Sequence, residues 1–248
     1  MIIVADIGNT NITLGIFNGK NLEYQYTIFS SLEKRQDEYI TELTEINLKY
    51  PIDKCLLGSV SDETLPKFKH ACDSVFQNEA IIIDRKSFDG LCYDVKYPQT
   101  IGIDRLANVY AFKDKYTKPV IVIDAGTAVT FDILTNGNTF SGGIIMAGIR
   151  TQLRALNLYT SKLPQVEIKD SIPIIGKTTE ENILSGVVQG LACSVDGLIE
   201  KCENELGSNA IIAGCGGDIE IISKYMKRNL DIKDTAITLK GLLSTELY

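Results

Sequence analysis

An α/β fold built from two copies of one structural unit is predicted by an internal repeat in this chain of 248 residues. Val4-Ala5-Asp6-Ile7-Gly8 returns as Val122-Ile123-Asp124-Ala125-Gly126, so each copy is an apolar strand that ends in Asp-x-Gly. A second apolar run and a closing Asn-Gly turn follow in both copies, at Asn18-Gly19 and at Asn136-Gly137. A single offset relates all of these positions, which favours two related domains that face each other across a cleft.

The first half is expected to contain three strands followed by alternating helices and strands. The Asn18-Gly19 turn is a strong hairpin signal, and Pro51 lies just beyond the end of an apolar helical stripe. The expected strands are Ile2–Ala5, Ile12–Phe17, Leu22–Phe29, Cys55–Val60 and Ala80–Ile83, and the expected helices run from Ser30 or Ser31 to about Tyr50, from about Asp62 through Phe76, and from Gly102 to about Lys115. The stretch from Asp84 to Ile101 is less regular.

The second half repeats this order after a boundary near Tyr116-Thr117-Lys118-Pro119, which gives domains 1–117 and 118–248. Thr178-Thr179-Glu180-Glu181 has the pattern of a capping box, and Gly207 closes the long apolar helix that it opens. The expected strands are Val120–Ile123, Val129–Leu134, a strand from Phe140 onward, and Ala210–Ala213, and the expected helices are Ile149–Leu158, Thr178–Leu206, Ile219–Asn229 and Leu239–Leu247.

Composition excludes several classes of function. The net charge of −7 and the lack of a Lys/Arg block argue against nucleic-acid binding. The single histidine, His70, makes a zinc site or a His-based catalytic triad improbable. Six cysteines without CxxC spacing indicate core thiols in a reducing compartment. Because a strand follows Met1 directly and no apolar run approaches membrane-spanning length, we expect a cytoplasmic protein without a membrane partner.

The segment from Asp6 to Asn11 is the richest candidate site. Asp6 is expected at the carboxyl end of a strand, where α/β sheets bind ligands, and Gly8 permits close backbone approach. Asn9, Thr10 and Asn11 are short donors suited to phosphate oxygens, although an Asx-rich turn would have the same composition. The repeat at Asp124-Ala125-Gly126-Thr127 favours phosphate handling, with a hydroxyl at Thr127 and a carboxylate at Asp124 that could bind a cation or orient water.

Two other segments are less specific. Asp104 in Gly102-Ile103-Asp104-Arg105 could accept a proton from a substrate hydroxyl while Arg105 binds an anion, or Asp104 could simply stabilise a helix start. Glycines at Gly142-Gly143 and at Gly214-Cys215-Gly216-Gly217 could be tight turns or could lie against a nucleotide. Neither a Walker A nor a GxGxxG pattern is present, so the sequence supports neither a P-loop nor a Rossmann site.

Five motifs together resemble type III pantothenate kinases, which belong to the actin/Hsp70/sugar-kinase superfamily. These are DIGNTN from Asp6, GIDR from Gly102, DAGTAVTFD from Asp124, SGGIIMAG from Ser141 and IGKTTEENILSG from Ile175. The resemblance covers essentially the whole chain. It implies duplicated ribonuclease H-like (actin-like ATPase) domains, a homodimer, and transfer of the γ-phosphoryl group of ATP to the primary hydroxyl of pantothenate, the first step of coenzyme A biosynthesis.

The resemblance also implies roles for individual residues. Asp104 matches the catalytic base, and Gly102, Ile103, Asp104 and Arg105 match the pantothenate-contacting segment. Asp124 matches the ligand of a potassium or ammonium ion, Thr127 an ATP contact, and Thr179 a pantothenate contact donated by the partner subunit. The ATP phosphate loop, with Asp6 near Mg²⁺, corresponds to Asp6, Ile7, Gly8, Asn9, Thr10, Asn11, Ile12 and Thr13.

This chain departs from the family pattern at two positions. Val95 stands where the family commonly has a substrate-contacting tyrosine, which leaves nearby Tyr97 as the candidate, and Ala147 stands where a proline is common. Two other functions are therefore kept open. One is a related phosphotransferase with another small hydroxyl or carboxyl acceptor, and the other is a non-catalytic regulatory protein on the same fold.

Overall fold

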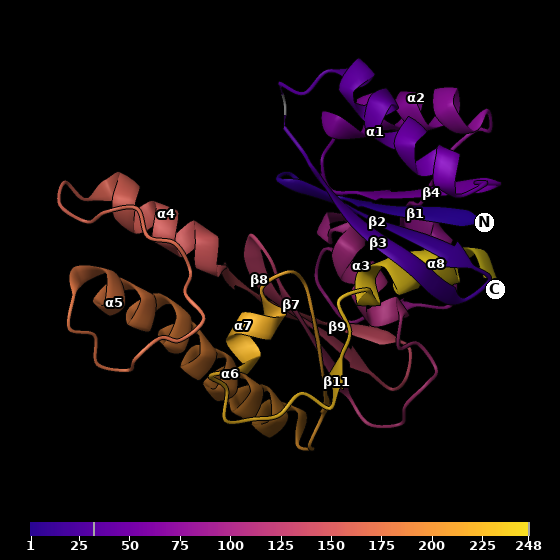
Figure 1. Cartoon of the computed structure of the whole chain (residues 1–248). Helices are drawn as coiled ribbons and strands as arrows, with labels where there is room; N and C mark the ends of the chain where they lie inside the picture. The colour runs from indigo at the N-terminus through magenta and orange to yellow at the C-terminus, as the bar shows by residue number, and fades with distance from the viewer. Residues whose placement is uncertain (32, 248) are drawn as a thin grey trace. The chain divides into compact units, whose positions relative to one another are not determined.

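The computed structural model describes residues 1–31 and 33–247, with the side chain of residue 247 left out. The chain forms two compact units (Figure 1). Unit 1 comprises Met1–Lys113 and Ala236–Tyr248, and unit 2 comprises Asp114–Thr235.

Unit 1 contains a five-stranded sheet in the order β3-β2-β1-β4-β5. Strand β1 pairs antiparallel with β2 and parallel with β4, while β2–β3 is antiparallel and β4–β5 parallel. The strands are β1 Ile2–Ile7, β2 Asn11–Asn18, β3 Asn21–Phe29, β4 Lys54–Ser59 and β5 Ile81–Ile82, followed by the short strand β6 Cys92–Tyr93. The helices are α1 Gln36–Lys49, α2 Thr64–Phe76, α3 Ile103–Tyr110 and α8 Ile237–Leu247, and 3₁₀ turns occur at Arg85–Ser87 and Pro98–Thr100.

Unit 2 repeats this topology strand for strand. Within the unit the strand order is β11-β10-β7-β8-β9. Strand β7 pairs antiparallel with β8 and parallel with β10. The outer pairs are antiparallel for β8–β9 and parallel for β10–β11. The strands are β7 Val120–Ala125, β8 Ala128–Thr135, β9 Thr139–Ala147, β10 Ile211–Cys215 and β11 Ile232–Lys233. The helices are α4 Ile149–Tyr159, α5 Thr179–Leu184, α6 Gly190–Leu206 and α7 Ile219–Ser223, and a π-helical turn at Ser185–Gln189 joins α5 to α6. The prediction of a duplicated α/β fold is therefore confirmed.

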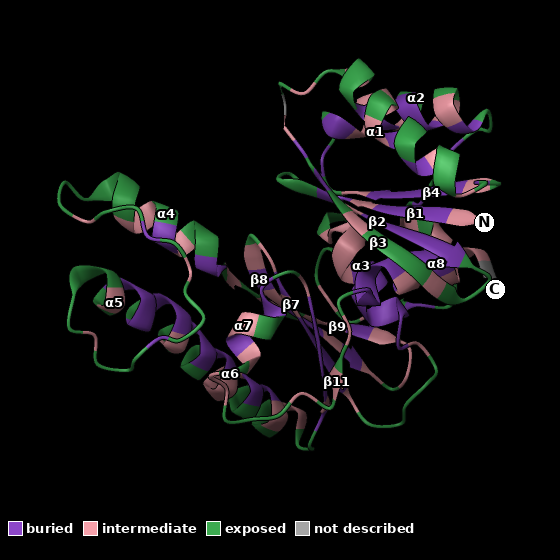
Figure 2. Cartoon of the chain, in the orientation of Figure 1, coloured by how far each residue is buried: buried purple, intermediate pink, exposed green. Residues whose placement is uncertain are grey.

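Each unit has a core of its own (Figure 2). In unit 1 the apolar face of β1 and β2 packs on α1 and α2, with Tyr39 and Phe68 in edge-to-face contact between the two helices. In unit 2 the sheet packs on α4, on the helix that includes α6, and on α7. Strand β1 is buried on both faces, which explains why its sequence is continuously apolar rather than alternating.

The last helix packs within unit 1, whereas the sequence-based domains 1–117 and 118–248 place it in the second half. Helix α8 lies against α3 so closely that a Cβ on Gly241 would overlap the carbonyl of Ala107. Thr238 Oγ1 and the buried Asn108 Oδ1 lie 2.7 Å apart in a hydrogen bond between the same two helices. These contacts link residues far apart in the sequence, so no local pattern could have indicated them.

Three expected helix boundaries were wrong. Helix α1 begins at Gln36 rather than at Ser30 or Ser31, because Glu38 accepts the N–H of Arg35 at the actual start. Helix α3 ends at Tyr110, and the chain continues in tight turns to Asp114, which has a φ of 58°. Helix α7 ends at Ser223, because the N–H groups of Lys227 and Arg228 bond to Asp196 instead of continuing the helix.

One helix has the expected length but contains a longer apolar run than the sequence predicted. Thr179–Leu206 spans 28 residues and by length and composition alone could cross a membrane, in contrast to our expectation that no run approaches that length. Its inward side chains, including Leu184, Val188 and Val195, belong to the core of unit 2. The burial of this face accounts for the apolar composition of the helix.

Candidate active site

The predicted phosphate loop connects β1 to β2 at the carboxyl end of β1. Asp6 is half-buried and pairs in register with Thr13 of β2, while Asn9, Thr10 and Asn11 are exposed. The turn is closed by the N–H of Gly8, which donates to the carbonyl of Asn11 at 2.9 Å. The side chains of Asn9, Thr10 and Asn11 are therefore accessible to solvent.

Two members of the predicted phosphate loop cannot offer their side chains. Ile7 and Ile12 are fully buried in the core of unit 1, opposite each other in the β1–β2 ladder. Only their backbone groups could face a ligand. The loop is bonded to the segment after β3, because the carbonyl of Thr10 accepts the N–H of Ser30 at 2.8 Å.

The structure places the Gly102–Arg105 segment near the same edge of the sheet in unit 1. Val60 follows β4 and donates its N–H to the carbonyl of Ile7 at 3.0 Å. Its side chain is also a close neighbour of Gly102, where an added Cβ would lie 3.2 Å from Val60 Cγ1. Val60 thus links the end of the strand that carries Asp6 to the start of α3, which carries Asp104.

Asp104 lies in the first turn of α3, as the sequence predicted. Its Oδ1 accepts the N–H of Arg105 at 2.8 Å, and Gly102 leaves it room because a Cβ there would overlap this oxygen. Burial raises the pKa of Asp104 above its ordinary value of 3.8, against the opposing effects of that N–H and of the Arg105 charge. A carboxylate with a raised pKa is suited to accept a proton.

The irregular segment before α3 contains an arginine that the sequence analysis did not single out. Arg85 donates from Nη2 to the carbonyl of Ile101 at 3.0 Å, directly before Gly102, and lies over the ring of Tyr93. Its Nη1 is buried without a hydrogen-bond partner among the described residues. Burial raises the pKa of Tyr93, and the nearby Arg85 charge opposes this. Tyr97 is instead 65 % exposed, so its side chain is accessible to a ligand.

The second predicted loop, from Asp124 to Thr127, joins β7 to β8 in unit 2. It is closed like its counterpart in unit 1: the N–H of Gly126 donates at 2.9 Å to the carbonyl of Ala128, the first residue of β8. Asp124 is half-buried at the end of β7 and pairs in register with Thr130 of β8 and Cys215 of β10.

Glycines flank this second loop on both sides. The N–H of Gly148, which precedes α4, donates to the carbonyl of Thr127 at 3.0 Å, and a Cβ on Gly148 would overlap the carbonyl of Gly126. Gly216 has a φ of +86°, and a Cβ there would overlap both the carbonyl of Ala125 and Oδ1 of Asp124. Close backbone approach, rather than a simple turn, is therefore the reason for glycine at both positions.

The donor set is compatible with a divalent cation that is bound together with the nucleotide. Among the described residues no cluster of three His, Cys, Asp or Glu side chains could hold a metal ion. Mg²⁺ bound to a nucleotide needs only one or two protein carboxylates, and its other ligands are phosphate oxygens and water.

Thr179 is the first residue of α5 and is exposed. Its neighbour Thr178 is the N-cap and accepts the N–H of Glu181 at 3.2 Å, which confirms the helix start that the sequence predicted. Thr179 itself is thus not needed for capping, and its side chain is accessible to a ligand.

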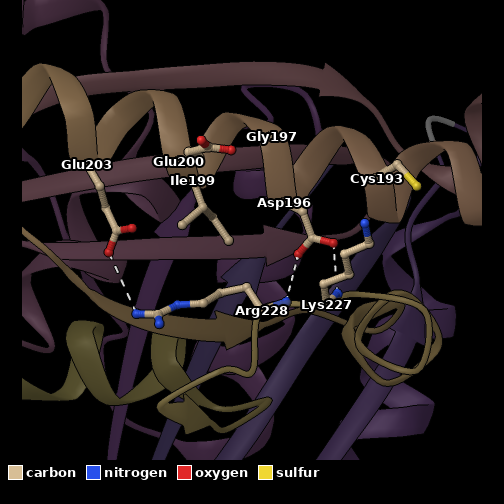
Figure 3. A pocket seen from close by; sticks show the side chains of 8 residues that line it. All are labelled: Cys193, Asp196, Gly197, Ile199, Glu200, Glu203, Lys227 and Arg228. Atoms are coloured by element: carbon tan, nitrogen blue, oxygen red, sulfur yellow. Dashed lines mark hydrogen bonds and ion pairs between the residues drawn. The ribbon is translucent and has the colours of Figure 1, made fainter.

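A cavity of about 400 Å³ lies elsewhere on unit 2, between α6 and the turn after α7 (Figure 3). Asp196 accepts the N–H groups of Lys227 and Arg228 at 2.8 and 3.0 Å, and Arg228 lies 3.6 Å from Glu203. None of the predicted site residues lines this cavity. Its polar groups are largely engaged in holding the turn against α6, which is a structural role.

Known proteins resemble this chain over nearly its whole length. Residues 2–201 match the model of the type III pantothenate kinase family. Type III pantothenate kinases of Finegoldia magna and Syntrophus aciditrophicus are 35 % and 32 % identical to this chain, over 98 % of it and 95 % and 97 % of their own lengths.

Two solved structures share the fold. One is described as a Baf family transcriptional activator from Campylobacter jejuni (TM-score 0.59, 21 % identity, 98 % of this chain and 96 % of that chain). The other is the activator of 2-hydroxyisocaproyl-CoA dehydratase from Clostridium difficile with bound ADPNP (TM-score 0.56, 14 % identity, 99 % and 94 %). The duplicated actin-like ATPase fold is thereby confirmed, and the family match establishes that this chain belongs to the type III pantothenate kinases.

Proposed function

We propose that this chain carries out the reaction of its family, the transfer of the γ-phosphoryl group of ATP to the primary hydroxyl of pantothenate. The observation that carries the proposal is the position of Asp104. This partly buried carboxylate has a raised pKa and lies in the first turn of α3, and Val60 links that helix to the end of β1, which bears Asp6. In this assignment Asp104 accepts the hydroxyl proton, directly or through one water.

The phosphate loop positions the nucleotide. Phosphoryl transfer depends mainly on positioning and on neutralising charge, and Asn9, Thr10 and Asn11 expose hydrogen-bonding side chains for this purpose. Asp6 would hold Mg²⁺, directly or through water. When bound, Mg²⁺ supplies positive charge to the phosphate oxygens. Ile7 and Ile12 contribute through their backbone only, since their side chains are buried.

The second loop is assigned to ATP and to a monovalent cation. Asp124 holds a potassium or ammonium ion, and Thr127 contacts ATP. Support comes from the matched geometry of the two loops, each closed by a glycine N–H that donates to the start of the next strand. Such an ion supplies further positive charge near the phosphates.

The acceptor is bound by Gly102, Ile103, Asp104 and Arg105, with Tyr97 taking the place of the tyrosine that Val95 replaces. We propose a homodimer in which Thr179 of one protomer contacts the pantothenate bound by the other. Four apolar side chains of unit 2, at the end of α4 and shortly before α5, are 67 to 83 % exposed: Leu158, Tyr159, Ile174 and Ile175. Such exposure is expected of a surface that a second copy covers.

A cytoplasmic location without nucleic-acid or membrane partners stays a prediction. All six cysteines are free thiols and four of them are buried, which agrees with the core role expected for most of them. A reducing compartment is consistent with this pattern.

The reaction is tested by a coupled assay from which ATP, pantothenate and potassium are omitted in turn. We expect turnover to require the first two and to fall strongly without the third. Asp104→Asn should abolish turnover while ATP binding stays largely intact. Equal rates across a panel of other hydroxyl acids and sugars would favour a different acceptor, and no ATP consumption in the complete mixture would favour the regulatory alternative.

A further inference from the structure

An arginine and a buried aspartate bridge the two flanks of the Asp124–Thr127 loop in unit 2. Arg150 lies in the first turn of α4, two residues after Gly148, and Asp218 follows Gly217 after β10. Arg150 Nε is 3.6 Å from Asp218 Oδ1. Both flanks are bonded to the loop itself, because Gly148 donates to the carbonyl of Thr127 and the N–H of Asp218 donates to the carbonyl of Ala125 at 2.9 Å.

The burial of these two side chains is strongly unequal. The Asp218 side chain is 7 % exposed, whereas that of Arg150 is 74 % exposed. Although Asp218 is the N-cap of α7, its carboxylate makes no capping hydrogen bond. Within the described part of the chain its contact with Arg150 is its only interaction with a charged side chain.

This arrangement is poorly explained by stability. A carboxylate loses hydration when it is buried, and one exposed arginine beyond hydrogen-bond distance compensates for little of that loss. Burial accordingly raises the pKa of Asp218, and the Arg150 charge opposes the shift only in part. An apolar residue at position 218 would lose less hydration free energy on burial than this carboxylate does. The pair is better explained as a device that orients the arginine.

The orientation leaves the arginine ready for an anion. A guanidinium has five N–H donors, and contact through Nε leaves its Nη1 and Nη2 edge free to bind two oxygens of a phosphate. No other hydrogen bond or ion pair of Arg150 occurs among the described residues. The guanidinium also stands at the N-terminus of α4, an eleven-residue helix, where the helix dipole favours negative charge.

We infer that Arg150 is a nucleotide-binding residue whose guanidinium, held by Asp218, binds phosphate groups of the ATP that contacts the Asp124–Thr127 loop. This inference rests on the proposed function, because it assumes that ATP binds at this loop. Arg150 contacts the phosphates, and Asp218 is a positioning residue that acts through it.

The test compares Arg150→Met with Arg154→Met, which removes an exposed arginine one turn further along the same helix. Titration calorimetry measures the dissociation constants of Mg·ATP and of adenosine without pantothenate. Because charge-assisted hydrogen bonds are strong, we expect Arg150→Met to weaken ATP binding about tenfold to a hundredfold and to leave adenosine unchanged. Arg154→Met should leave both unchanged. Equal ATP affinities for the two variants would overturn the inference.

Two further variants keep the test decisive. Asp218→Asn retains the Arg150 charge but releases the guanidinium, so ATP binding should weaken by a few fold; an unchanged dissociation constant would refute the positioning role. If Arg150→Met unfolds because Asp218 is left without a partner, the double variant Arg150→Met/Asp218→Asn replaces it. Should the wild type bind ATP but not phosphorylate pantothenate, the proposed function fails while the comparison of ATP affinities still decides the role of Arg150.

Discussion

Gly216 offers the sharpest test of the geometry around the second loop. Replacing it by alanine places a Cβ where the carbonyl of Ala125 and Oδ1 of Asp124 already lie, and 2.6 Å from the nitrogen of Ala125. The φ of +86° adds strain, since a side chain in this region costs about 1–2 kcal/mol. Crowding against a backbone that cannot yield costs a further ~1–3 kcal/mol. We therefore expect Gly216→Ala to lower the free energy of unfolding by about 2–5 kcal/mol.

The neighbouring glycine provides a matched control. A Cβ on Gly217 would meet no atom within 4 Å, and its φ is not positive, so Gly217→Ala should change stability by less than about 1 kcal/mol. Because the chain lacks tryptophan, thermal unfolding is best followed by far-ultraviolet circular dichroism. At about 2–4 °C per kcal/mol, Gly216→Ala should unfold roughly 4–20 °C below the control. Equal unfolding temperatures for the two variants would refute the close contact described here.

Three further predictions concern Asp104 and Asp124. Burial raises the pKa of Asp104 in the folded state above its unfolded value near 3.8, so the folded chain binds the proton more tightly and loses stability as the pH rises from the unfolded pKa through the folded pKa. Asp104→Asn should therefore raise the unfolding temperature at pH 7. A gain in unfolding temperature that does not shrink on titration toward pH 4 would contradict this cause. Gly102→Ala should lower kcat at least tenfold, because its Cβ would displace the Asp104 carboxylate, while the dissociation constant of ATP measured by calorimetry stays within about twofold. Asp124→Asn should abolish the stimulation of turnover by potassium, and a potassium titration that matches the wild type would remove the assigned ion from Asp124.

Much of the fold was predictable because its signals are local. Asn18-Gly19 and Asn136-Gly137 lie in the connections between the second and third strands of each unit, and Gly19, Asn136 and Gly137 have the positive φ that such turns require. The Asp-x-Gly repeat predicted strands that occupy equivalent positions in two sheets of the same topology. Each of these features depends on a few consecutive residues, and the constant offset between the copies reveals their relationship.

The remaining features depend on contacts between distant segments. Helix α8 packs on α3, with which it shares no sequence pattern, and so the last helix falls in unit 1. Arg85 lies in an irregular segment without a motif, and its bond to Ile101 exists only because the chain folds back before α3. The Arg150–Asp218 pair joins two segments 68 residues apart. In the sequence, these arginines look like ordinary surface residues.

The two copies of the Asp-x-Gly motif have diverged in their surroundings, and this divergence is consistent with the different cations proposed for Asp6 and Asp124. After β1 the turn is open, and it exposes the amide and hydroxyl side chains of Asn9, Thr10 and Asn11. After β7 the turn lies against the backbones of Gly148 and Gly216, and carbonyl oxygens of the turn itself are among the atoms closest to these two glycines. Donor groups suit anionic phosphate, whereas a carboxylate among carbonyls suits a weakly hydrated cation. Adding a side chain at Gly148 or Gly216 should therefore disturb the cation site proposed at Asp124, because each added Cβ would overlap the backbone of this turn.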